Sequence, residues 1–283
     1  MKLIFTFLIT FFSLSISAQS NFQGKATYMS KTSMDMSRFG NKMSEQQKKQ
    51  MMARFKNALE KTYTLNFNKI ESSFKENVKL DAPGTSGPRW ARSNGQGSVY
   101  KNLKEKEMIE DVEQFSKRFL IKEKMDQPKW QLGSESKKIG KYTAYKATLV
   151  KIDNTIDWAS IFRRRGGKNN KKKDSVSQNK KQKVTTKEIK TKLVTAWYTP
   201  QIPVSSGPAD YWGLPGLILE INSGRTTMLC TEIIINPDEK VEIKKPKKGK
   251  EVTREEYTKI VNEKTEELKE RFKNRRRGNR RGF

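Results

Sequence analysis

A proline- and glycine-rich connection between two apolar stretches, Trp197 to Asn222, constrains the fold of this chain more than any other segment. It reads WYTPQIPVSSGPADYWGLPGLILEIN. Leu214–Leu217 fits a type II turn, because proline fixes φ at the first central position and glycine supplies a positive φ at the second. The segment therefore predicts a strand end, an irregular excursion, a tight turn and a second strand.

Other parts of the chain show the apolar–polar alternation that is typical of strands. Turn signals separate nearly all of these stretches, and no helical pattern alternates with them, which argues against a parallel βαβ sheet. We expect a mainly β fold, a meandering antiparallel sheet with one buried and one wetter face. The predicted strands are residues 21–30, 63–67, 72–75, 98–103, 118–122, 142–152, 192–198, 217–222 and 226–235.

Two helices are predicted from capping boxes that precede apolar residues at helical spacing. The first spans Ser44 to Leu59 and begins with the pair Ser44 and Gln47. The second spans Thr253 to Phe272 and begins with Thr253 and Glu256. The first is inserted among the strands. The second either packs across the sheet or extends outward as an arm that binds a partner.

The N-terminus has the pattern of a secretory signal peptide. Lys2 precedes an uncharged apolar run from Leu3 to Ile16, and the small residues Ser17 and Ala18 follow. The run is shorter than the roughly 20 residues that a transmembrane helix needs, and no later segment is apolar enough to span a bilayer. We expect cleavage after Ala18 and export to the periplasm or the exterior. Since no cysteine lies near that site, we expect no lipid anchor.

Two basic segments carry most of the formal net charge of +28. Residues 163–192 hold 13 Lys and Arg against two acidic residues, and residues 244–283 hold 16 against seven. Such composition cannot bury enough apolar surface to offset the entropy of ordering. The predicted organisation is a signal peptide (1–18), a β-domain in two parts (19–162 and 193–243), a basic disordered insertion (163–192), a charged C-terminal helix (244–274) and a basic disordered tail (275–283).

Dense basic charge attracts polyanions without specificity. No nucleic-acid recognition motif accompanies it, no aromatic residues interleave with it to stack bases, and export would separate the chain from cytoplasmic nucleic acid. Lipopolysaccharide, phospholipid headgroups and acidic glycans are therefore the candidate anionic partners. The alternative is a solvated face that keeps the protein soluble.

The residue types limit the available chemistry. The chain has no histidine, which removes the commonest general base and the usual catalytic zinc sites. Cys230 is the only cysteine, so an intramolecular disulfide is excluded, and its alternating apolar surroundings predict a buried, inert thiol. Asp157, Asp210 and Glu220 lie near aromatic residues, as in sugar-cleaving sites. A carboxylate-dependent hydrolase is therefore an alternative to a binding protein.

Methionines cluster near the N-terminal part of the mature chain. Met34 and Met36 supply a fragment of a Cu(I) site, because thioethers are soft ligands. Met51 and Met52 belong to the predicted helix, where methionine commonly fills gaps in a core. We therefore predict no bound metal and no cofactor.

The Trp197–Asn222 segment resembles the GLPGLI family of secreted Bacteroidetes-type proteins, whose molecular activity is unassigned. The resemblance extends over about residues 21–273 apart from the basic insertion. The motif residues are Gly213, Leu214, Pro215, Gly216, Leu217 and Ile218, and further matching segments are Val99–Lys101, Phe119–Lys122, Lys129–Trp130, Ile139–Tyr142 and Lys146–Thr148. The resemblance implies export and a curved antiparallel sheet or half-barrel, like the bowl-shaped sheets of exported lipid and lipoprotein carriers.

The function expected from these observations is a non-enzymatic binding or accessory module of the cell envelope. The resemblance makes an outer-membrane transport receptor, another envelope protein, or a small apolar or glycan ligand the expected partner. The concave face of the sheet is expected to bind it. The expected contact residues are Trp197, Tyr198, Asp210, Tyr211, Trp212 and Glu220.

Overall fold

The computed structural model describes most of the chain after the predicted signal peptide. The described residues are 22–33, 44–77, 97–152 and 191–278. The predicted signal peptide, the Met34–Met36 fragment, Asp157 and most of the basic insertion lie outside them. The chain divides into two compact units, of which the first comprises residues 1–149 and 193–257 and the second residues 150–192 and 258–283.

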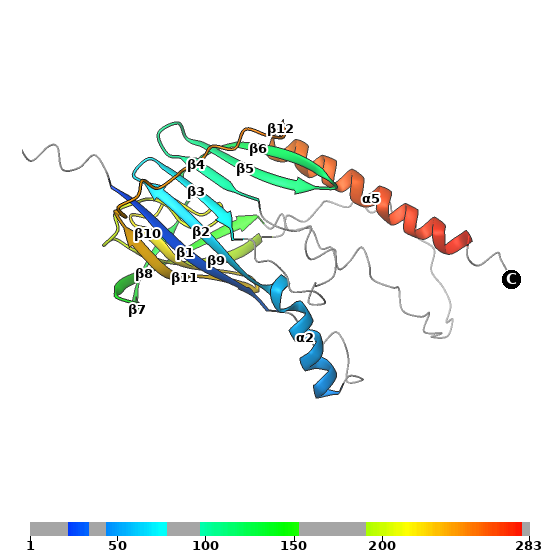
Figure 1. The fold of residues 1–283 in the computed structure, drawn as a ribbon, viewed down its shortest axis with the longest axis horizontal. Helices are drawn as coiled ribbons and strands as arrows, with labels where there is room; N and C mark the ends of the chain where they lie inside the picture. The colour runs from blue at the N-terminus through cyan, green and yellow to red at the C-terminus, as the bar shows by residue number, and fades with distance from the viewer. Residues whose placement is uncertain (1–21, 34–43, 78–96, 153–190, 279–283) are drawn as a thin grey trace, which may run out of the picture. The chain divides into compact units, whose positions relative to one another are not determined.

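The described strands form one open sheet in the order β12-β6-β5-β4-β3-β2-β1-β11-β10-β9-β8-β7 (Figure 1). The pairs with a defined register are antiparallel, except that β12 runs parallel to β6. The mainly β prediction is confirmed. The elements are β1 (Gln23–Thr32), α2 (Glu45–Leu59), β2 (Glu60–Asn68), β3 (Glu71–Glu76), β4 (Val99–Asn102), β5 (Glu107–Gln114), β6 (Lys117–Lys124), β7 (Gln131–Ile139), β8 (Tyr142–Ile152), β9 (Thr191–Thr199), β10 (Leu217–Ser223), β11 (Thr226–Ile235), β12 (Lys250–Val252) and α5 (Arg254–Gly278).

The main core lies on one face of the sheet, which we call the inner face. Ala26, Leu65, Phe74 and Val99 are consecutive register partners across β1 to β4, and each is at most 2% exposed. Side chains from β8 to β11 join the same apolar cluster. Period-two alternation places these residues on one face, and burying each large apolar side chain stabilises the fold by about 1.5–3 kcal/mol.

The opposite, outer face is crossed by residues 236–249, which we call the strap. Figure 1 shows the strap running from the end of β11 to β12. Along the way the Asn66 side-chain amide donates to the Glu242 carbonyl at 2.9 Å, and Ile243 packs against the small outer cluster of Tyr100, Ile109 and Leu120. The strap therefore covers the outer face from β2 to β6, and it places β12 beside the edge strand β6.

Both predicted capping boxes are confirmed. At Ser44 the backbone N–H donates to the Gln47 side chain at 3.0 Å, and the Gln47 N–H donates to the Ser44 hydroxyl at 3.2 Å. At Thr253 the reciprocal bonds with Glu256 are 2.9 and 3.2 Å. In the structure α5 begins at Arg254, whereas residues 244–253 of the predicted helical segment belong to the strap, β12 and the cap. The helix also continues to Gly278, past the start of the predicted tail.

The strand predictions missed β5, β7 and β12. β5 reads EMIEDVEQ, in which acidic residues interrupt the apolar alternation. β7 reads QLGSESKKI and is almost entirely exposed. β12 has three residues, held by parallel pairing to β6. None of the three presents an apolar face long enough to be recognised from sequence alone.

The predicted type II turn at Leu214–Leu217 is wrong. The Leu214 carbonyl accepts from the N–H of Gly216 at 2.8 Å, two residues on, while the N–H of Leu217 donates to Ile202 at 3.0 Å. Gly216 has φ +155°, far from the roughly +80° of a type II turn. The hydrogen bond from Leu217 to Ile202 therefore replaces the bond from Leu217 to Leu214 that a type II turn would have.

Replacing Gly216 by alanine is expected to lower the free energy of unfolding by more than about 3 kcal/mol, because strain and overpacking add. A Cβ there would lie 2.1 Å from the Thr199 carbonyl oxygen. Gly224→Ala is the matched control, since that glycine has φ +61° with nothing within 4 Å of a Cβ, and its expected cost is about 1–2 kcal/mol. Urea denaturation measures both, and equal losses would contradict the close approach.

Candidate functional site

The long connection between β9 and β10 is fixed by one buried lysine. Lys101 is 1% exposed and lies on the inner face of β4. Its ammonium donates to the backbone carbonyls of Gly207 at 2.7 Å, Ala209 at 2.8 Å and Tyr211 at 3.0 Å. An ammonium has three N–H donors, and each has an acceptor here. This arrangement offsets the desolvation that makes a buried charge costly.

Residues just before β7 bind the other side of this connection. The indole N–H of Trp130 donates to the Trp212 carbonyl at 2.8 Å, and the Gln127 side chain donates to the Gly213 carbonyl at 3.1 Å. Apolar side chains of the connection enter the main core. They are Ile202, Val204, Ala209 and Leu214, each at most 3% exposed. The predicted motif is therefore a docked part of the core.

The six predicted contact residues do not form one cluster. Tyr198 and Tyr211 are buried in the main core at 7% and 8% exposure, whereas Asp210 and Trp212 are half-buried in the connection. Trp197 and Glu220 are direct register partners on β9 and β10. Of the six, this last pair is joined directly across two neighbouring strands.

That pair lies in a polar cluster on the outer face. The Lys137 ammonium of β7 is 2.6 Å from Glu220 Oε2 and 4.3 Å from the centre of the Trp197 ring. The Asn222 side-chain amide donates to Glu220 Oε1 at 2.6 Å, and the Thr227 hydroxyl donates to Asn222 Oδ1 at 2.7 Å. We call these five residues the Trp197–Glu220 cluster. Its polar groups are joined across β7, β10 and β11.

A second group of carboxylates surrounds Arg254 at the start of α5. The Arg254 guanidinium donates to Glu110 at 2.5 Å and to Glu123 at 2.6 Å. Burial raises the pKa of Glu110; Arg254 opposes this shift, and the charges of Asp210 and Glu123 add to it. Burial alone would lower the pKa of Arg254, but its bonds and ion pairs with Glu123 and Glu110 raise it. Asp210 therefore acts electrostatically on Glu110.

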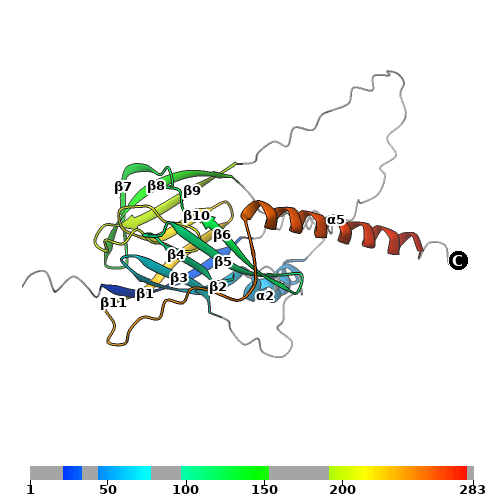
Figure 2. The ribbon, with the colours of Figure 1, turned by 90° about the horizontal axis from the view of Figure 1, so that it is seen from above.

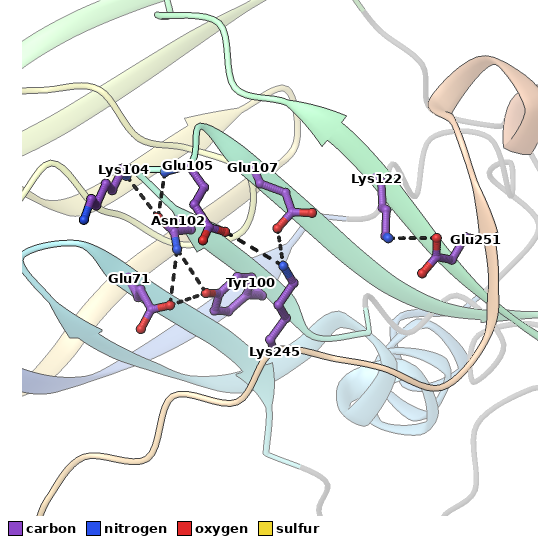
Figure 3. Close-up of polar contacts among 9 residues, drawn as sticks. All are labelled: Glu71, Tyr100, Asn102, Lys104, Glu105, Glu107, Lys122, Lys245 and Glu251. Carbon is purple, nitrogen blue, oxygen red and sulfur yellow. Dashed lines mark hydrogen bonds and ion pairs between the residues drawn. The ribbon is translucent and has the colours of Figure 1, made fainter.

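A third network holds the strap against the outer face (Figure 3). Lys245 of the strap lies 2.5 Å from Glu107 and 3.9 Å from Glu105. Beneath it the Tyr100 hydroxyl donates to Glu71 in a short hydrogen bond. Burial, followed by the hydrogen bond to Glu71, raises the pKa of Tyr100 to about 12. A phenol held neutral in this way donates a hydrogen bond and does not serve as a base near neutral pH.

The burial predicted for Cys230 is confirmed. The thiol is free and buried, and burial is the main cause that raises its pKa from 9.0 to about 12. Thiolate is the reactive form of cysteine, so the folded protein keeps this residue inert. Among the described residues, no group of three His, Cys, Asp or Glu side chains is placed to hold a metal ion. No described helix is long and apolar enough to cross a membrane.

The charged residues that organise these sites are not among the residues predicted from the sequence. Lys101 could have been found from the sequence. It lies two residues after Val99 in a strand-like stretch, so both side chains are on the same, inner face, where a charge needs a buried partner. Lys137 had none, because β7 lacks a strand pattern. Glu110 and Arg254 are 144 residues apart in sequence, and only the path of the strap brings them together.

Comparison with known proteins gives a family match and a structural similarity. The model of the family described as "Protein of unknown function (Porph_ging)" matches residues 130–220, which run from just before β7 into β10. No curated protein matches the chain. Structures of PNGF-II in the C2 and P21 space groups resemble 85% of the chain at 12% and 13% identity, with a TM-score of 0.45. The chain spans 33% of the length of those structures.

Lys101→Met is expected to lower the free energy of unfolding by about 3–5 kcal/mol, because it leaves three buried carbonyl groups without their donor. Lys75→Met is the control, since Lys75 is exposed on β3 and its change is expected to stay within about 0.5 kcal/mol. Urea denaturation measures both variants. A Lys101 variant as stable as the control would show that the three hydrogen bonds do not fix the connection.

Stability is expected to fall as pH rises from about 9 toward about 12. The folded pKa values of Tyr100 and Cys230 are raised to about 12 from 10.0 and 9.0. Below the pKa that each group has in the unfolded chain, its neutral form contributes its full stabilisation. This contribution is lost as the pH rises toward the pKa that the group has in the folded protein. Urea denaturation across this range measures the fall, and Cys230→Ala is expected to delay its onset. A free energy of unfolding that stays constant from about pH 9 to about pH 12 would contradict the raised pKa values of Tyr100 and Cys230.

Proposed function

We propose that this chain is an exported protein of the GLPGLI family that acts as a non-enzymatic binding or accessory module of the cell envelope. Its N-terminal pattern supports export, and its GLPGLI sequence supports the family. We also infer that the sheet is curved like a half-barrel, because side chains from β1–β4 and from β8–β11 meet in one core on the inner face.

The β7 edge of the sheet carries the binding proposal. β7 is the last strand in the order, so its edge away from β8 has no partner strand in the described part of the chain. Large apolar side chains are exposed on this strand and the next two: Leu132 at 61%, Tyr145 at 39% and Leu193 at 61%. Figure 2 shows β7, β8 and β9 together at one side of the sheet. An open edge beside exposed apolar groups is a template for an added strand.

We therefore assign the β7 edge to an extended segment of a partner protein in the envelope. Main-chain hydrogen bonds to β7 would give affinity, and the neighbouring apolar side chains would give specificity. The family model matches residues 130–220, a range that includes β7 and the connection between β9 and β10.

The hydrolase alternative has weaker support in the geometry. Glu220 is paired with Lys137 and Asn222, and the charge of Asp210 raises the pKa of Glu110. The two predicted carboxylates thus belong to different groups. The polyanion alternative depends on the basic composition of residues 163–192 and 244–283, and a salt-sensitive complex would favour it.

Replacing Leu132 and Leu193 by aspartate is expected to reduce recovery of the partner at least about tenfold, because charge opposes burial at an apolar contact. The measurement is co-purification of tagged protein from native envelope, washed at about 1 M salt, where the Debye length is about 3 Å. Ile70→Asp is the matched control, since Ile70 is 46% exposed in the β2–β3 turn. A photo-crosslinking residue at position 132 is expected to capture the same partner.

Three outcomes would contradict this proposal. They are equal recovery with all variants, no crosslink at position 132, or loss of every bound component as salt rises. The last would favour the polyanion alternative. Turnover of a glycan by the wild type that Glu220→Gln or Asp210→Asn abolishes would favour the hydrolase.

A further inference from the structure

The Trp197–Glu220 cluster holds an ammonium group in an arrangement that proteins use for recognising amines. The Lys137 Nζ is 2.6 Å from a Glu220 carboxylate oxygen and 4.3 Å from the centre of the Trp197 ring. A carboxylate supplies charge and a hydrogen bond, and an indole face attracts a cation within about 6 Å of its centre. The ammonium thus has two different partners, on β9 and β10.

The two partners are positioned without help from Lys137. Trp197 and Glu220 are register partners in the antiparallel β9–β10 pair. The second carboxylate oxygen of Glu220 accepts from Asn222, whose own carbonyl accepts from Thr227 of β11. The side chain of Glu220 is only 14% exposed. The host half of the site is therefore preorganised by the sheet, a condition that lowers the cost of binding.

The ammonium comes from the least buried part of the sheet. Lys137 lies on the edge strand β7, its side chain is 36% exposed, and the β7–β8 pairing is irregular between Leu132 and Ser136. A lysine reaches the site on a flexible four-carbon stem. Withdrawal of this ammonium into solvent would break none of the backbone pairing among β9, β10 and β11.

We propose that Trp197, Glu220 and Asn222 form a binding site for a primary alkylammonium group, and that Lys137 is its internal occupant. An external ammonium displaces Lys137 and takes its place against the indole and the carboxylate. The group comes from a small free amine or from a lysine side chain on another protein. The site lies on β9 and β10 and does not depend on a partner strand at β7.

The test uses Lys137→Ala, which removes the occupant and leaves space for n-propylammonium chloride as the probe. Binding is read from tryptophan fluorescence and from the melting temperature. The response of the variant is expected to saturate. Its affinity for n-propylammonium is expected to be at least about tenfold higher than that of the wild type, because the internal competitor is gone. Propanol and potassium chloride at equal concentration are expected to give none. Adding Glu220→Gln to the variant is expected to abolish the response.

A second probe distinguishes the sources. Nα-acetyl-lysine methylamide binding more tightly than n-propylammonium would indicate a protein lysine, and equal or weaker binding would indicate a free amine. If Lys137→Ala fails to fold, Lys137→Ser serves instead. The proposal is overturned if the folded variant gives no saturable response, if Glu220→Gln leaves the response intact, or if the wild type binds as tightly as the variant.

Discussion

The hydrogen bonds of the buried Lys101 are the constraint on which the rest of the structure depends. They join β4 to the connection before β10, and so they join the two halves of an open sheet through its inner face. Without this contact the connection would leave its carbonyl groups unsatisfied in the core, where each costs about 1–3 kcal/mol. The chain thus uses one charged side chain where a purely apolar contact could not satisfy the backbone.

The two faces of the sheet are consequently suited to different tasks. The inner face is filled by apolar side chains and by the docked connection. The outer face carries paired polar groups, with the strap over β2 to β6 and the Trp197–Glu220 cluster over β9 to β11. A ligand therefore meets the outer face and the β7 edge more readily than the inner face. The binding surfaces that we propose accordingly lie at the β7 edge and on the outer face, and not in the concave interior expected from the sequence.

Much of the fold follows from local sequence, and much of the candidate site does not. Alternation in β2 and the capping box at Ser44 are local signals, and the structure confirms them. The turn at Gly216 was predicted wrongly, because the N–H of Leu217 donates to the Ile202 carbonyl in the connection and not to the Leu214 carbonyl across the turn. Lys137 meets Glu220 across 83 residues, and no local pattern encodes that pairing. Long-range polar partners decide the site, and sequence spacing does not show them.

Amide hydrogen exchange of the native protein tests the central claim that the connection between β9 and β10, which contains the GLPGLI sequence, is part of the core. The N–H groups of Leu217 and Ile218 bond to Ile202 and Ser206 inside the connection. They are expected to exchange as slowly as those of β1 and β2, by global unfolding only, while the β7 edge exchanges much faster. Exchange of Leu217 and Ile218 at the rate of β7 would contradict the account, because it would show a connection that opens independently of the core.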